Sequence, residues 1–531
     1  MKLLKYFKMK NISKTFQFFI ILIILLSFLR IDYRFKTSVE CCSDDYDYFI
    51  HAETIALDFD LDYTNQNPRD FRYYSNNKNT PIGFIGSGIL SAPFLLFGNI
   101  LSDLFNENLN SEILNYKIFF YSLSSVFYFL ISYFLIFKSL EKLNIKFEKY
   151  FLLLIFSGSG VSYFAFERFG MTHVYEVFSI SLLIFCCLNF YTNNIYFKYY
   201  ALLIPFVMLI GFLTRMSNIY IFLIPIIIKF FLKEKNIYTN KKLFFDFNFL
   251  ISSFFALIIY YFLSIELYGE FIISPQKIYG TNINVIDSYV SNNLFTTFTE
   301  LLNTVFIVIF TNEFGIFWVS PIIFIGLTLP LLKLRNINSY LILICFAQNL
   351  FIIHIWQALG SSYGFRYLMS LTPLSIFIYY VYFSKYKLLK YYLILFSVLG
   401  NLSVLFFETT TSTQLSTIDE LNSFGKTIRY IEPNYVTGLI NSIFEINSYL
   451  IIFSTSFLGA IFFKLFLVLL NSEQLFYYLE KLNLPVNNPD FIIYIDTLNN
   501  INLIKFVLVI FIFSIFSYIL INKLKNKSVK S

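Results

Sequence analysis

Long runs of apolar residues without charged side chains constrain this chain more than any other feature. A helix needs about 20 mostly apolar residues to cross a bilayer. Only 14% of the 531 residues are charged, whereas a soluble domain has about a quarter. The apolar runs lie near residues 15–31, 116–137, 151–166, 174–192, 199–214, 216–232, 247–265, 314–332, 338–355, 367–383, 391–407, 447–470 and 503–522. The sequence therefore predicts an all-α, polytopic integral membrane protein with about 12–13 transmembrane helices.

Lysine and arginine residues predict the orientation of these helices, because short cytoplasmic loops are enriched in both. If the runs cross alternately, the loops on one side carry the Lys residues of 138–149, 198, 233–242, 333–335 and 385–390. The basic N-terminus shares that side. The pattern fails at the end, where thirteen crossings would put the basic tail after residue 522 outside. Either one late run does not cross, or the rule is broken there.

The net charge of +7 indicates loops held at an anionic membrane surface rather than a nucleic-acid partner, because the lysines lie between apolar runs. The first run follows a basic start and precedes no small-residue cleavage site, so we read it as an uncleaved span. The five Cys residues form no disulfide framework. We expect a multi-pass protein of the plasma (inner) membrane with its reactive groups on the periplasmic or exterior face.

The first outer loop, residues 32–115, is the longest polar stretch. Within it, the apolar segment 82–98 contains four Gly and one Pro. A span here would invert every later loop, so we expect an interfacial or re-entrant helix. We divide the chain into residues 1–407, a transmembrane catalytic region, and residues 408–531, a C-terminal region of unknown role with one or two further spans.

Scarce ionisable residues gather on the outer side. All three histidines (His51, His173 and His354) fall there, as do most acids near the ends of runs. Ionisable groups near membrane depth are costly and usually face a cavity or a partner. This distribution predicts an outward-facing polar cavity, which would suit an enzyme or a transporter.

The acidic stretch 43–62 is the richest candidate site. If Tyr48 to Leu57 is helical, Asp44 and Asp45 lie at the helix N-terminus, where carboxylates are favoured. A carboxylate there could deprotonate a hydroxyl or hold a divalent cation such as Mg²⁺ or Mn²⁺. The alternative is a solvated acidic loop. Asp58, Asp60 and Asp62 alternate as in a calcium loop but lack its Gly and closing Glu.

Two further outer segments carry candidate residues. The hairpin 166–173 holds Glu167, Arg168 and His173, of which the first two could simply pair with each other. The segment 356–368 begins at Trp356 and ends just after Arg366, whose guanidinium could grip a phosphate at headgroup depth. The alternative for Arg366 is a side chain that snorkels from a helix end.

These segments, taken in order, resemble the C-type (GT-C) polyprenyl-phosphate-dependent glycosyltransferases, which include protein O-mannosyltransferases and the bacterial lipid A aminoarabinose transferase. The resemblance covers roughly residues 15–375 and is nearest to a bacterial mannosyltransferase-like branch. Its motifs match the following segments: Ser43 to Tyr48 with Ala52 and Asp58 to Asp62, Pro81 to Gly98, Met171 to His173, Gly315 to Pro321, and Trp356 to Leu368. Asp45 replaces a usual Glu, Phe59 a Gly, and Ala358-Leu359 part of a Gly pair.

The resemblance implies a GT-C fold and an inverting transfer of a sugar from a polyprenyl phosphate to a hydroxyl of a lipid, glycan or protein. It implies that Asp44, or alternatively Asp45, acts as base or orients the acceptor. Arg366 would hold the lipid phosphate, with Arg215 or Arg168 as second cation. The remaining implied site residues, which would shape the sugar and acceptor site, are His173, Glu167, Tyr48 and Trp356, with segments 82–98 and 271–311 lining the cavity. The resemblance fixes no cofactor, and a divalent cation (Mg²⁺ or Mn²⁺) held by Asp44 is the one candidate that it leaves open.

Two other functions fit a protein of this kind. An O-antigen ligase or polymerase uses the same lipid carrier but would place its large outer loop late, whereas the large loop here comes first. A flippase or transporter for lipid-linked sugars would place polar groups near the bilayer midplane in paired repeats. The sequence has no repeated half, and its charges cluster at one rim.

Overall fold

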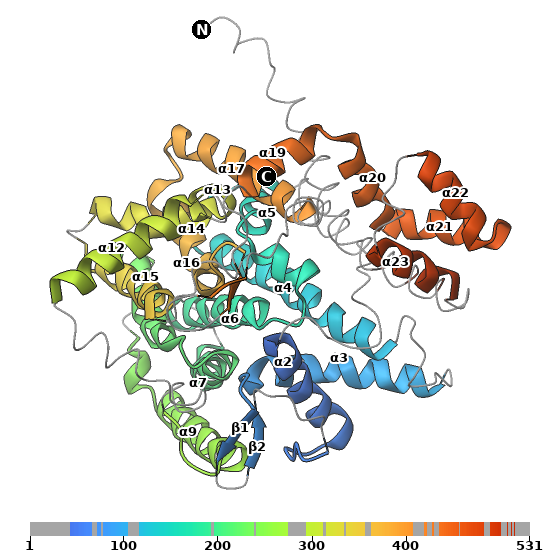
Figure 1. The fold of residues 1–531 in the computed structure, drawn as a ribbon. Coiled ribbons are helices and arrows are strands. Elements are labelled where there is room, and N and C mark those ends of the chain that lie inside the picture. Colours follow the sequence, from blue (N-terminus) through green and yellow to red (C-terminus); the bar gives the residue numbers. More distant parts are fainter. Residues whose placement is uncertain are drawn as a thin grey trace, which may run out of the picture.

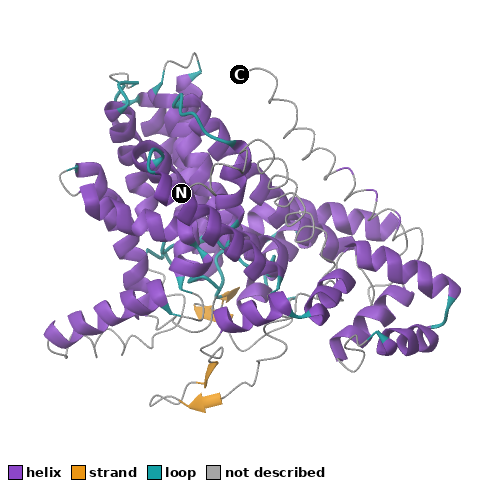
Figure 2. Ribbon diagram, turned by 90° about the horizontal axis from the view of Figure 1, so that it is seen from above, coloured by secondary structure: helices purple, strands orange, loops and turns teal. Residues whose placement is uncertain are grey.

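The computed structural model describes residues 43–65, 72–75, 78–104, 116–192, 196–237, 241–273, 294–311, 315–333, 336–355, 363–406, 419–421, 427–429, 435–455, 457–482 and 489–500, with single positions at 507, 511 and 515. The predicted first span at 15–31 lies outside these residues. So does the last run at 503–522, apart from the three single positions. Nearly all of the described chain is helical (Figure 2).

In the part of the chain that the structure describes, seven helices are long and apolar enough to cross a membrane, by length and composition. They are α3 (Ile85–Leu104), α4 (Tyr116–Lys142), α6 (His173–Tyr191), α7 (Phe197–Thr214), α9 (Phe247–Tyr268), α15 (Ile337–Ile355) and α17 (Lys387–Leu405). The all-α, membrane-protein prediction is therefore supported. The prediction that α3 lies in the outer interface stays a prediction.

Four other predicted spans are helical but divided. The run 151–166 forms α5 (Lys149–Ser157) and the π-helix η4 (Tyr163–Glu167), and 216–232 forms the 3₁₀-helix η5 (Ile219–Leu223) and α8 (Ile224–Glu234). The run 314–332 forms α13 (Ile316–Val319), α14 (Pro321–Thr328) and η7 (Leu329–Lys333). The run 367–383 lies in η8 (Arg366–Leu371), α16 (Thr372–Ile378) and the π-helix η9 (Tyr379–Phe383), which follow without a break.

The sequence predicted one spanning helix over the run 447–470, and this prediction is wrong. The run forms α20 (Ile446–Thr455) and α21 (Phe457–Leu469). The ring centroids of Phe453 and Phe462 are 5.9 Å apart, whereas nine residues of straight α-helix span roughly 13.5 Å. The chain therefore turns between the two helices, and each alone is too short to cross a bilayer.

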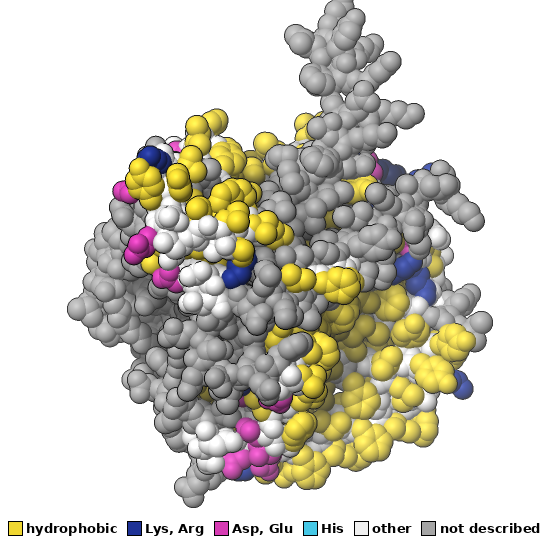
Figure 3. Space-filling model, turned by 90° about the vertical axis from the view of Figure 1, so that its right-hand side faces the viewer, with side chains coloured by type: hydrophobic (Ala, Val, Ile, Leu, Met, Phe, Trp, Pro, Cys, Tyr) yellow, Lys and Arg dark blue, Asp and Glu magenta, His cyan; other side chains and the backbone are white. Residues whose placement is uncertain are grey.

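Helix α6 forms the centre of the bundle and is buried on nearly every side (Figure 1). It packs against α4, α7 and α8. In contrast, α9 leaves Phe254, Leu257 and Phe262 exposed, as expected of a helix that faces lipid. Figure 3 shows a broad apolar area on one face of the molecule, with charged side chains mostly at its margins.

Connections rich in lysine meet at one end of the bundle, which we call the lysine-rich end. Lys142 donates a hydrogen bond to Asn189, and Lys241 donates to the carbonyl of Thr192. Lys390 pairs with Glu148 at 2.7 Å. These contacts bring together the connections that the sequence placed on the cytoplasmic side. His173 begins α6, and the other end of α6 reaches this cluster, so His173 lies away from the lysine-rich end.

Two short antiparallel ribbons complete the described fold. Strand β1 (Arg72–Ser75) pairs with β2 (Lys78–Pro81), with Arg72 opposite Pro81. Lys78 reaches Glu266 near the end of α9 at 2.9 Å, so this ribbon is docked on α9. The second ribbon pairs β3 (Asp419–Leu421) with β4 (Thr427–Arg429).

The C-terminal region adds short helices: α19 (Tyr435–Phe444), α20, α21, α22 (Ser472–Lys481) and α23 (Pro489–Asn500). Leu405 and Phe406 at the end of α17 pack with Leu439 and Ile452. Lys464 on α21 donates to the carbonyl oxygens of Leu498 and Asn499, at the end of α23. Two helices that are distant in sequence are thereby joined. The remaining described helix, α12 (Leu294–Phe310), contacts α13 and α15.

Candidate functional site

The acidic stretch of the first outer loop begins a helix, as predicted. Helix α2 (Ser43–Glu53) has Asp44 and Asp45 in its first turn and continues into the π-helix η3 (Thr54–Asp58). Exposed N–H groups at a helix start favour carboxylates there. The two acids leave the helix toward different arginines, so they have different surroundings.

A buried histidine holds α2 in place. His51 Nε2 lies 2.7 Å from the Gly83 carbonyl oxygen, and Nδ1 lies 2.7 Å from the Tyr63 hydroxyl. Because a carbonyl only accepts, Nε2 carries the proton and Nδ1 accepts from the tyrosine. Gly88 on α3 packs so closely that a Cβ there would lie 2.5 Å from the His51 Cβ. The histidine therefore joins α2 to the start of α3.

Asp44 pairs with Arg366, which lies 322 positions later in the sequence. The Asp44 Oδ2 atom is 3.2 Å from an Nη atom of Arg366. The Asp44 side chain is 45% exposed and that of Arg366 is 16% exposed, so solvent reaches the carboxylate more easily. The turn before Arg366 contains two residues with left-handed backbone, Gly364 at φ 59° and Phe365 at φ 53°. Such a conformation is costly for a non-glycine residue.

Asp45 is much more enclosed. Both of its carboxylate oxygens accept from Arg168, at 3.3 and 3.4 Å, and only 3% of its side chain is exposed. The sequence left open a pairing of Glu167 with Arg168, and the structure shows that Arg168 bridges to Asp45 of α2. The Glu167 side chain lies outside the described residues.

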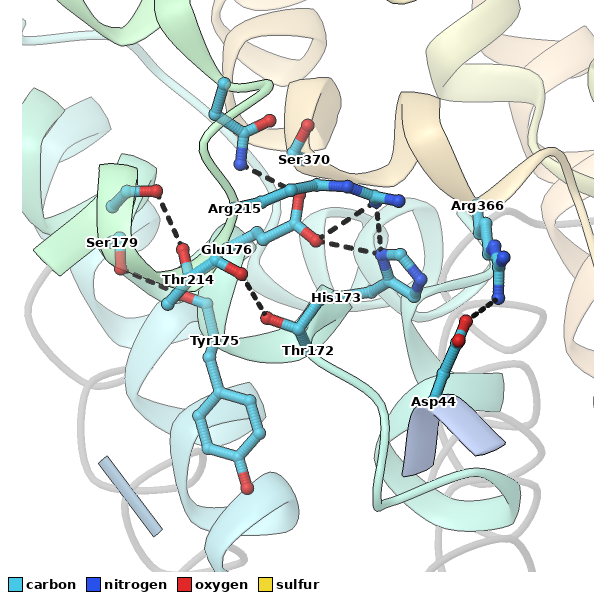
Figure 4. Close-up of polar contacts among 12 residues, drawn as sticks. Asp44, Thr172, His173, Tyr175, Glu176, Ser179, Thr214, Arg215, Arg366 and Ser370 are labelled. Carbon is cyan, nitrogen blue, oxygen red and sulfur yellow. Dashed lines mark hydrogen bonds and ion pairs between the residues drawn. The ribbon is translucent and has the colours of Figure 1, made fainter. Parts of the chain in front are cut away.

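A third ionic cluster lies at the start of α6 (Figure 4). His173 and Glu176 are one helical turn apart, with Nδ1 and Oε1 separated by 3.0 Å. Arg215, at the end of α7, approaches the same Glu176 oxygen at 3.4 Å, and Asn218 donates to the other oxygen at 2.9 Å. All four side chains are buried. Glu176 is therefore fully engaged in holding a cation and a histidine in place.

The Asp44–Arg366 pair and the cluster around Glu176 meet at the aromatic ring of Tyr367. The guanidinium carbon of Arg215 lies 4.0 Å from the ring centroid of Tyr367, and that of Arg366 lies 5.5 Å from it. In Figure 4, the His173 ring lies between the Arg215 and Arg366 side chains. The Nε atom of Arg366 is buried and has no hydrogen-bond acceptor within the described residues. Cationic groups and a buried donor thus converge beside Asp44, an arrangement that suits an anion.

Other predicted residues are placed differently. Tyr48 is only 5% exposed and packs against Gly83, so it belongs to the core. Trp356 lies outside the described residues. Of the stretch 271–311, the described part is mainly α12, where Thr304 contacts His354 Nδ1 at 2.8 Å.

The acids that alternate like a calcium loop form turns. Asp60 accepts from the backbone N–H of Asp62, and Asp62 accepts from that of Thr64. The hydrogen bond from Thr64 lowers the pKa of Asp62. Such contacts are typical of Asx turns. Among the described residues, no three His, Cys, Asp or Glu side chains are grouped so that they could hold a metal ion.

Sequence reasoning missed three participants. Glu176 was noted only as one of several outer acids, although its spacing of three from His173 puts both on one helical face. Asn218 and Tyr367 gave no signal of their own.

Comparison with protein-family models, curated proteins and solved structures found no match.

Proposed function

We propose that this protein is a membrane glycosyltransferase of the GT-C type, which moves a sugar from a polyprenyl-phosphate donor to an acceptor hydroxyl with inversion at the anomeric carbon. The observation that carries the proposal is the Asp44–Arg366 pair beside Arg215 and His173. A phosphate leaving group needs a cation, and an attacking hydroxyl needs a base. This pair supplies both at one point.

The Arg366 side chain would bind the donor phosphate. Its Nε atom is buried without an acceptor among the described residues, and its Nη atom contacts a carboxylate that is 45% exposed. A phosphate oxygen can replace that carboxylate and engage the guanidinium through two parallel hydrogen bonds. Arg215 would add positive charge while remaining fixed by Glu176.

Phosphate binding would also release the base. Once Arg366 turns to the phosphate, the Asp44 carboxylate is free to accept the proton of the acceptor hydroxyl. The hydroxyl oxygen then bonds to the anomeric carbon, and the bond from that carbon to the phosphate oxygen breaks. The electron pair stays on the phosphate, whose added negative charge Arg366 neutralises.

Transfer assays in membranes test the proposal. Membranes containing the protein would receive radiolabelled polyprenyl-phosphate sugars, both hexoses and pentoses. Asp44→Asn should lose about 10²–10⁴-fold in rate, as expected on removal of a general base. Arg366→Ala should lose about 10²–10³-fold, as on removal of one preorganised charge-stabilising donor.

Asp60→Asn is the matched control, because Asp60 is an exposed acid of the same loop. It should retain wild-type transfer. Undiminished transfer in both Asp44→Asn and Arg366→Ala would refute the site. Movement of intact lipid carrier without sugar transfer would refute the enzyme class and favour a flippase.

A further inference from the structure

A cavity of about 490 Å³ opens at the lysine-rich end, away from the candidate site. Three segments line it: residues 143–146 after α4, Lys235 and Ile237 after α8, and, in the helical run that begins at Arg366 and just after it, Tyr380 and Ser384. The volume lies within the range of small-molecule sites. We propose that this cavity binds the phosphate group of an anionic lipid.

The first observation is a pair of lysines that have no ion-pair partner among the described residues. Lys146 and Lys235 both line the cavity. Within the described part of the chain, neither forms an ion pair. The acids on the same segments are engaged elsewhere: Glu141 pairs with Lys138 at 2.8 Å, Glu148 pairs with Lys390, and Glu234 accepts from Asn336.

The helix ends beside the cavity do not need these lysines. After α4, the N–H groups of Asn144 and Ile145 bond to the carbonyls of Glu141 and Leu140. The same pattern follows α8, where the N–H groups of Asn236 and Ile237 bond to Lys233 and Leu232. Both asparagines have positive φ, 52° and 54°. Each helix therefore closes on its own backbone, and the lysine ammonium groups are left for another anion.

A buried hydroxyl is the second, independent observation. Tyr380 lines the cavity, is only 4% exposed, and its hydroxyl has no hydrogen-bond partner within the described residues. A buried hydroxyl without a partner costs roughly 1–3 kcal/mol, so a ligand that accepts from it is favoured. A phosphate oxygen accepts such a bond and is attracted to both lysines.

The apolar lining favours a lipid over a free ion. Leu143, Ile145 and Ile237 share the wall with the polar groups. A glycerol backbone can pack on these side chains while its phosphate reaches Lys146 and Lys235. Basic pockets between helices at the cytoplasmic side are typical sites for anionic headgroups.

Thermal unfolding of the full-length protein in neutral detergent tests this site. Phosphatidylglycerol, phosphatidylcholine and inorganic phosphate would be added separately. We expect phosphatidylglycerol to raise Tm, and phosphatidylcholine, whose phosphate charge is balanced by its choline, to act much more weakly. The Lys146→Ala/Lys235→Ala variant should lose the rise, and Tyr380→Phe should need about 3–10-fold more lipid for the same shift.

Lys387→Ala is the control, since Lys387 is an exposed lysine of the same end outside the cavity lining. It should respond as the wild type does. The double variant must match the wild-type Tm without lipid, which separates lost binding from misfolding. A rise with inorganic phosphate as large as that with the lipid, lost in the double variant, would support the phosphate site and assign it to a free anion. No rise with either ligand, or an equal rise in the double variant, would overturn the proposal.

Discussion

Glu176 and Arg215 form an ion pair in the interior of the bundle, with side chains 0% and 8% exposed. They join the first turn of α6 to the end of α7. Removal of one partner from such a pair leaves an uncompensated charge and costs about 3–5 kcal/mol. The pair therefore contributes to folding as well as to the arrangement of cations at the site.

The first prediction follows from that pair. Glu176→Ala should destabilise the protein by about 3–5 kcal/mol, because Arg215 would lose the buried carboxylate that balances its charge. Thermal unfolding in detergent measures the change. The double variant Glu176→Ala/Arg215→Ala should lose less stability than the two single losses added together. Strictly additive losses would mean that the two residues are not coupled.

The second prediction separates the two neighbouring acids of α2. Asp44 is 45% exposed whereas Asp45 is 3% exposed. Asp44→Asn should change the free energy of unfolding by less than about 1 kcal/mol, because solvent reaches the Asp44 carboxylate, but it should strongly lower the proposed transfer activity. Asp45→Ala should cost about 1.5–3 kcal/mol, because Arg168 loses a charged hydrogen-bond partner. Equal stability losses in the two variants would contradict these separate roles.

The third prediction concerns the contact between α3 and α7. A Cβ at Gly86 would lie 2.3 Å from the backbone nitrogen of Thr214 and 2.4 Å from the carbonyl carbon of Leu213. Gly86→Ala should therefore cost about 1–3 kcal/mol or more, because backbone atoms cannot move aside. In Gly211→Ala, the Cβ meets the terminal methyl of Ile221, which can rotate. The alanine at 86 should lower Tm more than the one at 211, and the reverse order would contradict the close helix contact.

The fourth prediction is a topology. With α20 and α21 too short to cross singly, and with α3 in the outer interface as the sequence predicts, twelve of the thirteen apolar runs remain as crossings. An even number returns the basic tail to the side of the lysine-rich connections, as the distribution of lysine requires. A reporter fused after Ser531 and one inserted after Lys387 should show the same sidedness, and one inserted after Asp60 the opposite. A tail reporter on the same side as Asp60 would restore thirteen crossings.

Hydropathy predicted where the helices lie but not their type (3₁₀, α or π) or where one helix ends and the next begins. The run 367–383 carries no charged residue, and apart from Pro373 at the start of α16 its sequence gives no sign of the change from 3₁₀ through α to π geometry. The turn between α20 and α21 follows Ser454 and Thr455, in an uncharged stretch where average hydropathy stays high. Packing against neighbouring helices decides such features, and a pattern of single residues does not contain it.

The site was predicted residue by residue but not as a set of pairs. Scarcity and side of the membrane singled out Asp44 and Arg366, yet nothing in the sequence shows that residues 322 positions apart are in contact. The sequence left open whether Arg168 pairs with Glu167, and the structure shows Arg168 paired with Asp45. Chain order cannot show which of several outer acids each arginine selects, because the choice depends on how α2 rests on α3.

The unbroken helical run from Arg366 to Phe383 connects the candidate site with the cavity at the lysine-rich end, where Tyr380 lies. At about 1.5 Å per residue its length is roughly 27 Å, close to the thickness of a thin bilayer's hydrocarbon core. A hydrogen-bonded helical run has a fixed length and does not lengthen when the acyl chains around it are longer. If the run crosses the bilayer, a thicker membrane would have to thin around it or leave the Arg366 guanidinium below the lipid phosphates, each at a modest cost in free energy.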